Sequence, residues 1–408
     1  MIRSSSLTPL HRSLIAATAG AAVALTAGTQ AQEALNDGIP SDASFFTEII
    51  NLTGAPGEFP PAFMAPIGDP SGNTLTQLNI DGGGLSTGQR TYSFTEINFF
   101  APNTLNAGNF APNFVNSEVN LINGSLLNGA MFDAASTLNL TAGSIGNDSI
   151  INGTANATGG QFGNSTTVNG TLNLSGNALT LSVGTINTGG VVNVSENATL
   201  NLNFTLATGA TLNQTGGNIR SGLTIAGTAN ISGGGSGLSN TGGYTVQNGG
   251  VLNLSGGLIG SAELTVEDGG ILNQSGGDLG FNTHIESGGV LNVAGGDFGG
   301  TFAAGFAGID ILDGGTINFT GSEFFINGEA IDTAGGVFVI ADRDVALTGT
   351  LSDGSDINFT LNSTRALNDN FSNLFEAGST VTVTVIPEPT SLALLGLGGL
   401  LLARRRRA

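Results

Sequence analysis

The sequence predicts an all-β fold, and within that class a parallel β-helix (β-solenoid) with about 20 residues per coil. Three observations lead to this prediction. A short motif centred on Asn recurs along the chain, apolar residues flank the Asn with the alternation of a strand, and glycines separate the copies. We also expect a C-terminal antiparallel β cap and a short C-terminal hydrophobic helix.

The repeated motif consists of an apolar residue or Thr, an apolar residue, Asn, and usually another apolar residue, often followed by Ser or Thr and Gly. Strong copies between residues 171 and 321 read TLNLSG, VVNVSE, TLNQTGG, TANISGG, VLNLSGG, ILNQSGG, VLNVAGG and TINFTG. Weaker copies begin at QLNIDGG, residue 77 onward, and the Asn positions follow one another at intervals of 17 to 26 residues. A second short strand precedes many copies, as in LTVEDGG and THIESGG.

A unit of this length cannot enclose a core by itself, but stacked units can, because each strand pairs with its equivalent one coil away. Strand side chains alternate between faces, so the apolar second position of the motif must point inward. The neighbouring Asn then points outward or lies at a corner, where equivalent Asn side chains can form a hydrogen-bonded ladder. Gly pairs supply the positive φ that sharp corners need.

Two other β architectures compete with this interpretation. A sandwich or barrel of hairpins would use aromatic core anchors, whereas this chain has no Trp and two Tyr. A calcium-binding β-roll needs a nine-residue repeat, which GGDLG and GGDFGG resemble only locally.

We divide the chain into five parts. They are a signal peptide at 1–31, an irregular N-terminal cap at 32–75, solenoid repeats at 76–321, a C-terminal β element at 322–385 and a C-terminal tail at 386–408. The first part has a weakly basic start, an apolar run and a cleavage site after Ala31. A buried N-terminal helix is the alternative for that segment.

Charge and composition limit the classes of molecule that the protein can bind. Residues 32–385 contain four Arg and 29 acidic residues, a net charge of −25, so we expect no nucleic-acid partner. The chain has no Cys, so no disulfide supports the fold.

The sequence indicates no catalytic residue. His284 is the one His after the signal peptide, and its position in THIESGG predicts an ordinary outward, solvent-facing residue. The acidic residues between 263 and 313 recur at about coil spacing and are interpreted as solvated corner residues. Asp268, Asp278 and Asp297 are weak candidates for Ca²⁺ ligands, and no other cofactor or metal is expected.

The last residues carry the most specific motif. Pro387, Glu388 and Pro389 precede the uncharged run 392–403, and four arginines follow it: Arg404, Arg405, Arg406 and Arg407. The arginines cannot cross a membrane, so they act as a stop-transfer signal.

The arrangement resembles the PEP-CTERM sorting signal of exported bacterial proteins. The resemblance implies transient membrane insertion, cleavage near residues 387–389 by an exosortase-type enzyme, and release or transfer to the surface. A permanent anchor or an apolar C-terminal helix is the alternative.

These observations predict a non-enzymatic structural or adhesive protein of the cell surface or extracellular matrix, with extracellular polysaccharide as a candidate partner. The alternative is a carbohydrate-active β-helix enzyme, either a polysaccharide hydrolase or a lyase. Three or more carboxylates converging in a groove would favour the enzyme.

Overall fold

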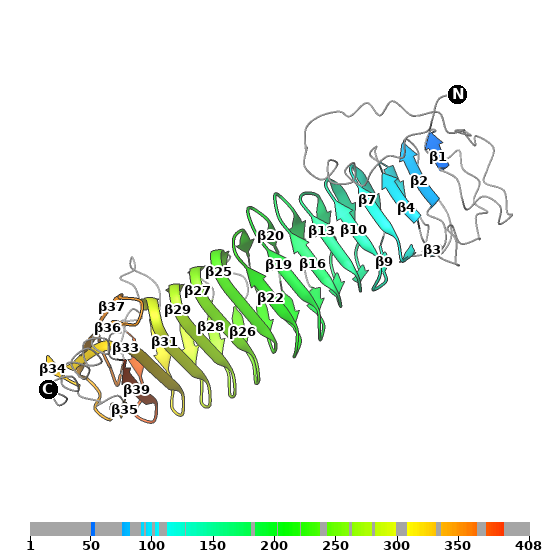
Figure 1. The fold of residues 1–408 in the computed structure, drawn as a ribbon. Helices are drawn as coiled ribbons and strands as arrows, with labels where there is room; N and C mark the ends of the chain where they lie inside the picture. The colour runs from blue at the N-terminus through cyan, green and yellow to red at the C-terminus, as the bar shows by residue number, and fades with distance from the viewer. Residues whose placement is uncertain are drawn as a thin grey trace, which may run out of the picture. The chain divides into compact units, whose positions relative to one another are not determined.

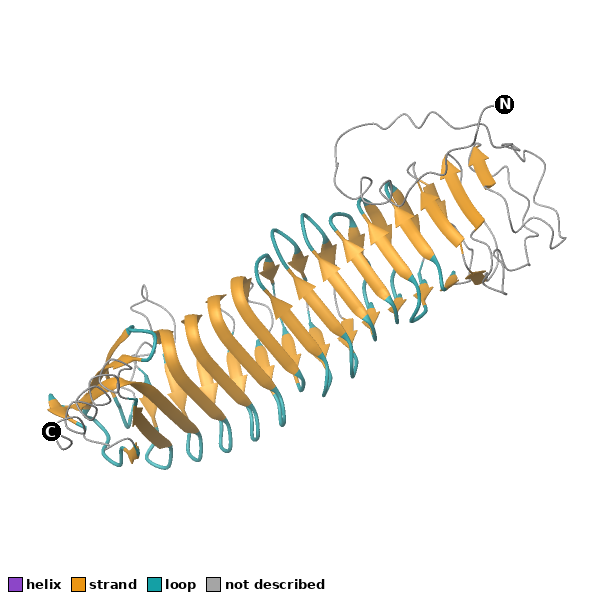
Figure 2. Cartoon of the chain, viewed as in Figure 1, coloured by secondary structure: helices purple, strands orange, loops and turns teal. Residues whose placement is uncertain are grey.

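A computed structural model of the protein describes residues 50–53, 76–81, 91–93, 95–99, 103–105, 112–126, 128–180, 184–201, 203–220, 222–236, 243–260, 263–279, 282–298, 308–331, 336–364 and 373–386. All of them belong to one compact unit, residues 34–408. Every regular element in these ranges is a β-strand (Figure 2). The expected signal peptide with Ala31 and the expected C-terminal helix lie outside the described residues.

The strands build two sheets, and successive coils stack along one axis (Figure 1). The larger sheet, among the described residues, contains β1 (Ile50–Thr53), β2 (Thr76–Asp81), β4 (Thr95–Phe99), β5 (Asn103–Leu105), β7 (Glu118–Leu121), β8 (Gly124–Leu126), β10 (Thr137–Leu140), β11 (Gly143–Ile145), β13 (Thr154–Ala157), β14 (Gln161–Phe162), β16 (Thr171–Leu174), β17 (Leu179–Thr180), β19 (Val191–Val194), β20 (Thr199–Leu200), β22 (Thr211–Gln214), β23 (Asn218–Ile219), β25 (Thr228–Ser236), β27 (Val251–Ile259), β29 (Ile271–Leu279), β31 (Val290–Phe298), β33 (Thr316–Ile326), β34 (Glu329–Ala330), β35 (Val337–Val339), β36 (Ala346–Leu351), β37 (Asp356–Thr360) and β39 (Thr380–Val385).

The smaller sheet contains the short strands that precede the corners. They are β3 (Thr91–Ser93), β6 (Asn113–Val115), β9 (Met131–Phe132), β12 (Ile150–Ile151), β15 (Thr167–Val168), β18 (Gly184–Ile186), β21 (Phe204–Leu206), β24 (Leu223–Ile225), β26 (Tyr244–Val246), β28 (Leu264–Val266), β30 (Thr283–Ile285), β32 (Ile309–Ile311) and β38 (Leu374–Phe375).

Pairing between coils is parallel and in register with the sequence repeat. On β16 and β19, Leu172 pairs with Val192 and Asn173 with Asn193. From β25 onward the first two limbs of each coil merge into one long strand with a bulge after the motif, as between β27 and β29. The predicted parallel β-helix is therefore confirmed.

The core is the column of inward residues inside the coils. The apolar second position of every strong motif copy is fully buried: Leu172, Val192, Leu212, Ala229, Leu252, Leu272, Leu291 and Ile317. Strand alternation therefore places these residues inside, as the sequence predicts.

Gly pairs make the corners, and the two members have different tasks. Gly249 has a φ of 76°, in the left-handed region that a side chain disfavours. At Gly250, a Cβ atom would lie 2.1 Å from the carbonyl oxygen of Ile225 in the preceding coil. Gly249 therefore allows the chain to turn, and Gly250 allows this coil to pack closely on the preceding one.

The motif Asn residues form a continuous side-chain ladder along the larger sheet. Each Nδ2 donates to the Oδ1 of the preceding coil, for example Asn193 to Asn173 at 2.7 Å and Asn213 to Asn193 at 2.9 Å. The ladder extends from Asn98 to Asn318. Asn98 also donates to Glu96 Oε1 of its own strand at 3.4 Å, and Thr382 Oγ1 donates to Asn318 Oδ1 at 2.6 Å.

The stack extends beyond the repeats that the sequence indicates at both ends. On the N-terminal side, β1 pairs in parallel with β2, and Asn51 lies opposite Asn79, within the segment expected to be an irregular cap. On the C-terminal side, β39 pairs in parallel with β33, and Thr382 occupies the Asn position opposite Asn318.

The C-terminal element combines this parallel strand with antiparallel pairs. The second half of β33 pairs with β36, which forms a hairpin with β37 through the TLSDGSD turn. Phe359 of β37 packs on Phe319 and Phe375, each with 5.7 Å between ring centroids, and so covers the end of the core. The last strand therefore continues the solenoid in a region where the sequence predicts an antiparallel cap.

Within the part of the chain that the structure describes, no helix is long and apolar enough to cross a membrane.

Candidate functional site

The smaller sheet carries a row of outward Thr side chains that ends in a charged cluster. The row runs in register through Thr167, Thr185, Thr205, Thr224, Thr245 and Thr265. On the next two strands the same position holds His284 and then Asp310. A hydroxyl row thus gives way to a His–carboxylate pair near the C-terminal end of the stack.

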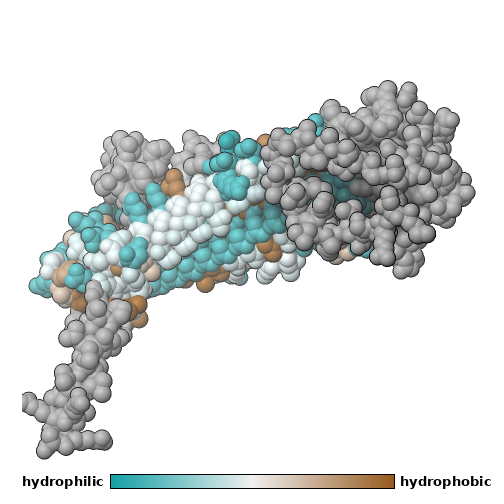
Figure 3. All heavy atoms as spheres, turned by 45° about the horizontal axis from the view of Figure 1, so that its top comes forward, coloured by the Kyte–Doolittle hydropathy of each residue, from teal (hydrophilic) through white to brown (hydrophobic). Residues whose placement is uncertain are grey.

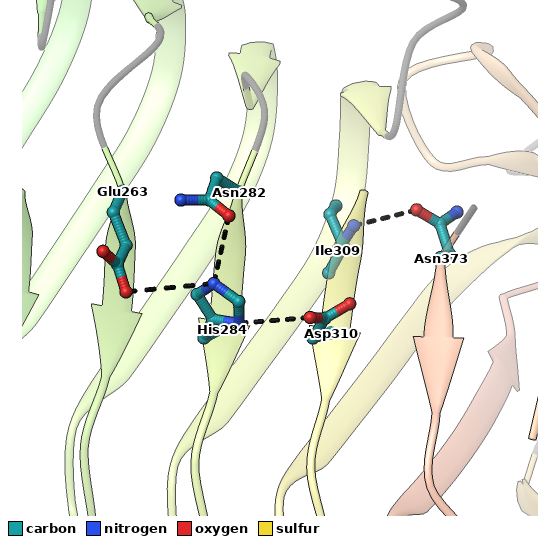
Figure 4. Close-up of polar contacts among 6 residues, drawn as sticks. All are labelled: Glu263, Asn282, His284, Ile309, Asp310 and Asn373. Atoms are coloured by element: carbon teal, nitrogen blue, oxygen red, sulfur yellow. Dashed lines mark hydrogen bonds and ion pairs between the residues drawn. The ribbon is translucent and has the colours of Figure 1, made fainter. Parts of the chain in front are cut away.

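Three consecutive coils contribute to this cluster (Figure 4). The Nδ1 atom of His284 lies 3.2 Å from Oδ2 of Asp310, and its Nε2 atom lies 3.9 Å from Oε1 of Glu263. Asn282, at a φ of 64°, places its Oδ1 atom 3.2 Å from the same Nε2 atom. The His284 side chain is 23% exposed and that of Asp310 is 6% exposed. His284 therefore lies on the outward face, as predicted, but it is half-buried and paired with Asp310, which the sequence interpretation did not foresee.

Both ring nitrogens of His284 face oxygen acceptors. A protonated imidazole can donate on both sides, whereas a neutral one can donate on one side only. The cluster thus links three coils through one side chain. On the far side of Asp310, Oδ1 of Asn373 accepts a hydrogen bond from the Ile309 amide at 2.9 Å and joins the last coil to this surface. Aligning LTVEDGG, THIESGG and IDILDGG would have found the His–Asp pair.

The three candidate Ca²⁺ ligands do not lie on equivalent positions. Asp278 and Asp297 are register partners on β29 and β31, whereas Asp268 is an exposed residue of the turn after β28. Asp353, from the β36–β37 turn, lies beside this pair and accepts a hydrogen bond from the Gly296 amide at 2.6 Å. In the described ranges, no group of three or more His, Cys, Asp or Glu residues has the arrangement of a metal site.

The pKa values of Asp278 and Asp353 are shifted in opposite directions. Burial, and then the charge of Asp297, raise the pKa of Asp278, whose Oδ1 is buried without a hydrogen-bond partner. Burial also acts to raise the pKa of Asp353, but hydrogen bonds from Ser355 and from the Gly296 amide outweigh it and lower that pKa.

Replacing Asp278 with Asn is expected to stabilise the fold at pH 7 by about 1 kcal/mol or less, because it removes a partly buried charge and the repulsion between two carboxylates in register. The folded-state pKa of Asp278 is raised above 3.8, so its destabilising effect is present at neutral pH and disappears as the pH falls through that pKa. Urea unfolding at pH 7 and below pH 3.8 measures the difference, with exposed Asp268→Asn as the control. An equal gain at both pH values would contradict the charge argument.

The sorting motif begins where the folded sheet ends. The last strand, β39, ends at Val385, and the amide of Ile386 still donates to the carbonyl of Gly321 at 2.7 Å. Pro387, Glu388 and Pro389, and Arg404 to Arg407, lie outside the described residues. The solenoid and the tail together define a class, the exported β-solenoid proteins that are sorted through their C-terminus.

Residues 385–407 match the family model described as the PEP-CTERM protein-sorting motif. The chain therefore carries a PEP-CTERM sorting signal, which makes it an exosortase substrate and an exported protein that is associated with the membrane before processing. No curated protein and no solved structure matches the chain.

Proposed function

We propose that the protein is a structural or adhesive component of the cell surface or the extracellular matrix, and that its solenoid binds extracellular polysaccharide through repeated polar rows. The observation that carries the proposal is the uninterrupted Asn ladder, which gives successive coils the same outer surface from Asn98 to Asn318. Figure 3 shows hydrophilic and neutral residues in rows that run along the stack.

A surface of identical rows suits a polymer that also repeats. One coil offers an amide of the Asn ladder and, on the smaller sheet, a Thr hydroxyl such as Thr205 or Thr224. Each contact is weak, but many coils bind the same polysaccharide chain at high effective concentration. The total affinity therefore grows with the number of coils. Direct hydrogen bonding to sugar hydroxyls needs no metal and no catalytic group.

The sorting route is tested by fractionating cells of an exosortase-containing host and determining the mature C-terminus by mass spectrometry. We expect the main form to end near residues 387–389 and to lack Arg404–Arg407. Changing Glu388 to Ala should keep the unprocessed chain in the membrane fraction, and exposed Asp268→Asn should be processed normally. A main wild-type form that retains the four arginines would defeat the sorting proposal.

One observation favours the alternative of a carbohydrate-active enzyme. Glu263, His284 and Asp310 meet on one face of the solenoid, where a polysaccharide could lie. Incubation with matrix polysaccharide separates the two functions. Retention of intact polymer supports adhesion, whereas new chain ends that disappear in the His284→Ala variant support catalysis.

A further inference from the structure

The distance between the folded solenoid and the membrane segment is short. Ile386 is hydrogen-bonded to Gly321, and the apolar run of the tail begins at Leu392. Six residue steps span at most about 22 Å even when fully extended. The hydrocarbon core of a bilayer is about 30 Å thick within a total of about 40–45 Å, which leaves about 5–8 Å of headgroups on each side. An inserted tail therefore holds the last strand within about 15 Å of the bilayer surface.

The exposed apolar side chains gather at this same end. Within the described residues, five large hydrophobic side chains are exposed, and four of them lie near the last strand: Val337 (65%), Phe338 (39%), Val339 (60%) and Ile386 (52%). Strand alternation places Val337, Val339 and Ile386 on the outward face of the β35–β39 pair and Phe338 on the opposite face, beside buried Val383. We call Val337, Val339 and Ile386 the apolar patch. Isolated exposed apolar residues are ordinary, but a contiguous group marks an interaction surface.

The apolar patch lies directly beside the point where the chain leaves the sheet. Strand β35 pairs antiparallel with β39, so that Val339 lies opposite Thr382 and Val337 lies opposite Thr384, two residues before Ile386. Arg343 holds β35 in place, since its guanidinium donates to the carbonyls of Ile340 at 2.9 Å and Ser379 at 2.6 Å. The surface is therefore preformed and needs no ordering when it binds.

We propose that the apolar patch rests on the lipid surface while the tail is inserted, so that the end of the solenoid is held against the bilayer and presents residues 387–389 at the membrane interface. The proposal rests on the sorting route described above. The reach of residues 387–391 selects lipid as the occupant, because it brings this face, and no other end of the described stack, to the membrane. The acidic chain disfavours anionic headgroups, so the contact is apolar and should form on zwitterionic lipid.

The experiment uses the full chain, which has no Cys and so accepts a single label at a chosen position. Three variants, Val337→Cys, Ile122→Cys and Leu400→Cys, are labelled with a polarity-sensitive fluorophore and added to phosphatidylcholine vesicles that contain a quenching lipid. Ile122 is the control, because it is also an exposed large apolar residue (39%) but lies after β7, many coils away. The label at position 400 reports insertion of the tail.

We expect a blue shift and loss of fluorescence at positions 337 and 400, with the label at position 122 unchanged. Quenching at 400 together with equal signals at 337 and 122 would overturn the docking proposal and leave the sorting route standing. An unquenched label at 400 would overturn the insertion step and the docking with it. Contact between copies would also overturn the docking proposal, and would appear as lipid-independent self-quenching at position 337 that rises with protein concentration.

Discussion

Replacing Leu252 with Ala is expected to lower the free energy of unfolding by about 2–5 kcal/mol, one of the largest effects available to a single substitution in this chain. Leu252 is fully buried and pairs with Ala229 in the preceding coil and with Leu272 in the next. Truncation leaves a cavity, and a coil cannot collapse around it because backbone pairing fixes the spacing to both neighbours.

A stack of coils is stabilised by contacts between neighbouring coils. The loss of stability in the Leu252→Ala variant should therefore affect the adjacent coils first and the whole solenoid only at stronger denaturation. Hydrogen exchange measured by mass spectrometry should show faster exchange in β25, β27 and β29 than in distant coils such as β10 and β13. Val251→Ala is the matched control, since its side chain is on the outward face of the same strand and should cost less than about 1 kcal/mol. Equal losses for both variants would contradict the assignment of inward and outward faces.

The second large effect is expected at the middle of the Asn ladder. Asn213 donates to Asn193 and accepts from Asn230, both at 2.9 Å. Ala at this position leaves one acceptor and one donor without their partners in a half-buried row, which should cost about 1–3 kcal/mol. The control is Asn248→Ala, because Asn248 is an exposed corner residue and its loss should be nearly neutral. Urea unfolding compares the two.

Changing Asn213 to Asp distinguishes the contribution of hydrogen bonding in the ladder from that of side-chain packing. An ionised carboxylate can accept from Asn230 but cannot donate to Asn193, so the folded state disfavours the charged form and raises the pKa of the introduced group. The loss of stability is then full at neutral pH and recovers as the pH falls through the raised pKa, where the protonated carboxyl can donate. A loss that is the same at every pH would show that the hydrogen-bond direction is unimportant.

The repeat made the core and the ladder predictable. The apolar residue before each Asn defines the inward face, and the equivalent position of the Asn residues defines the ladder, so a periodic sequence specifies its own register. The extra coils at the two ends were harder to recognise. INLTG at residue 50 is a single copy far from the others, and TVTVTV replaces the Asn with Thr382.

Contacts of residues that replace the repeated ones were not predictable from the Asn motif. His284 and Asp310 take the place of Thr on the smaller sheet, and only an alignment of the strands before the corners indicates that they pair. Arg343 bonds to Ser379 only because β35 folds back on β39, a pairing that alternation alone does not indicate. The sorting motif was predictable without knowledge of the fold, because its three parts follow one another directly in the sequence.

The hydrogen bonds of the Asn ladder have a further consequence. Every side-chain amide from Asn120 to Asn318 donates to the Asn of the preceding coil, so the row has one direction, and at its C-terminal end Asn318 accepts a hydrogen bond from the hydroxyl of Thr382. Since every interior link is the same, a whole coil can be duplicated or deleted within the row without leaving an unpaired amide. The length of the solenoid can therefore change in evolution while the end that leads into the sorting signal remains the same.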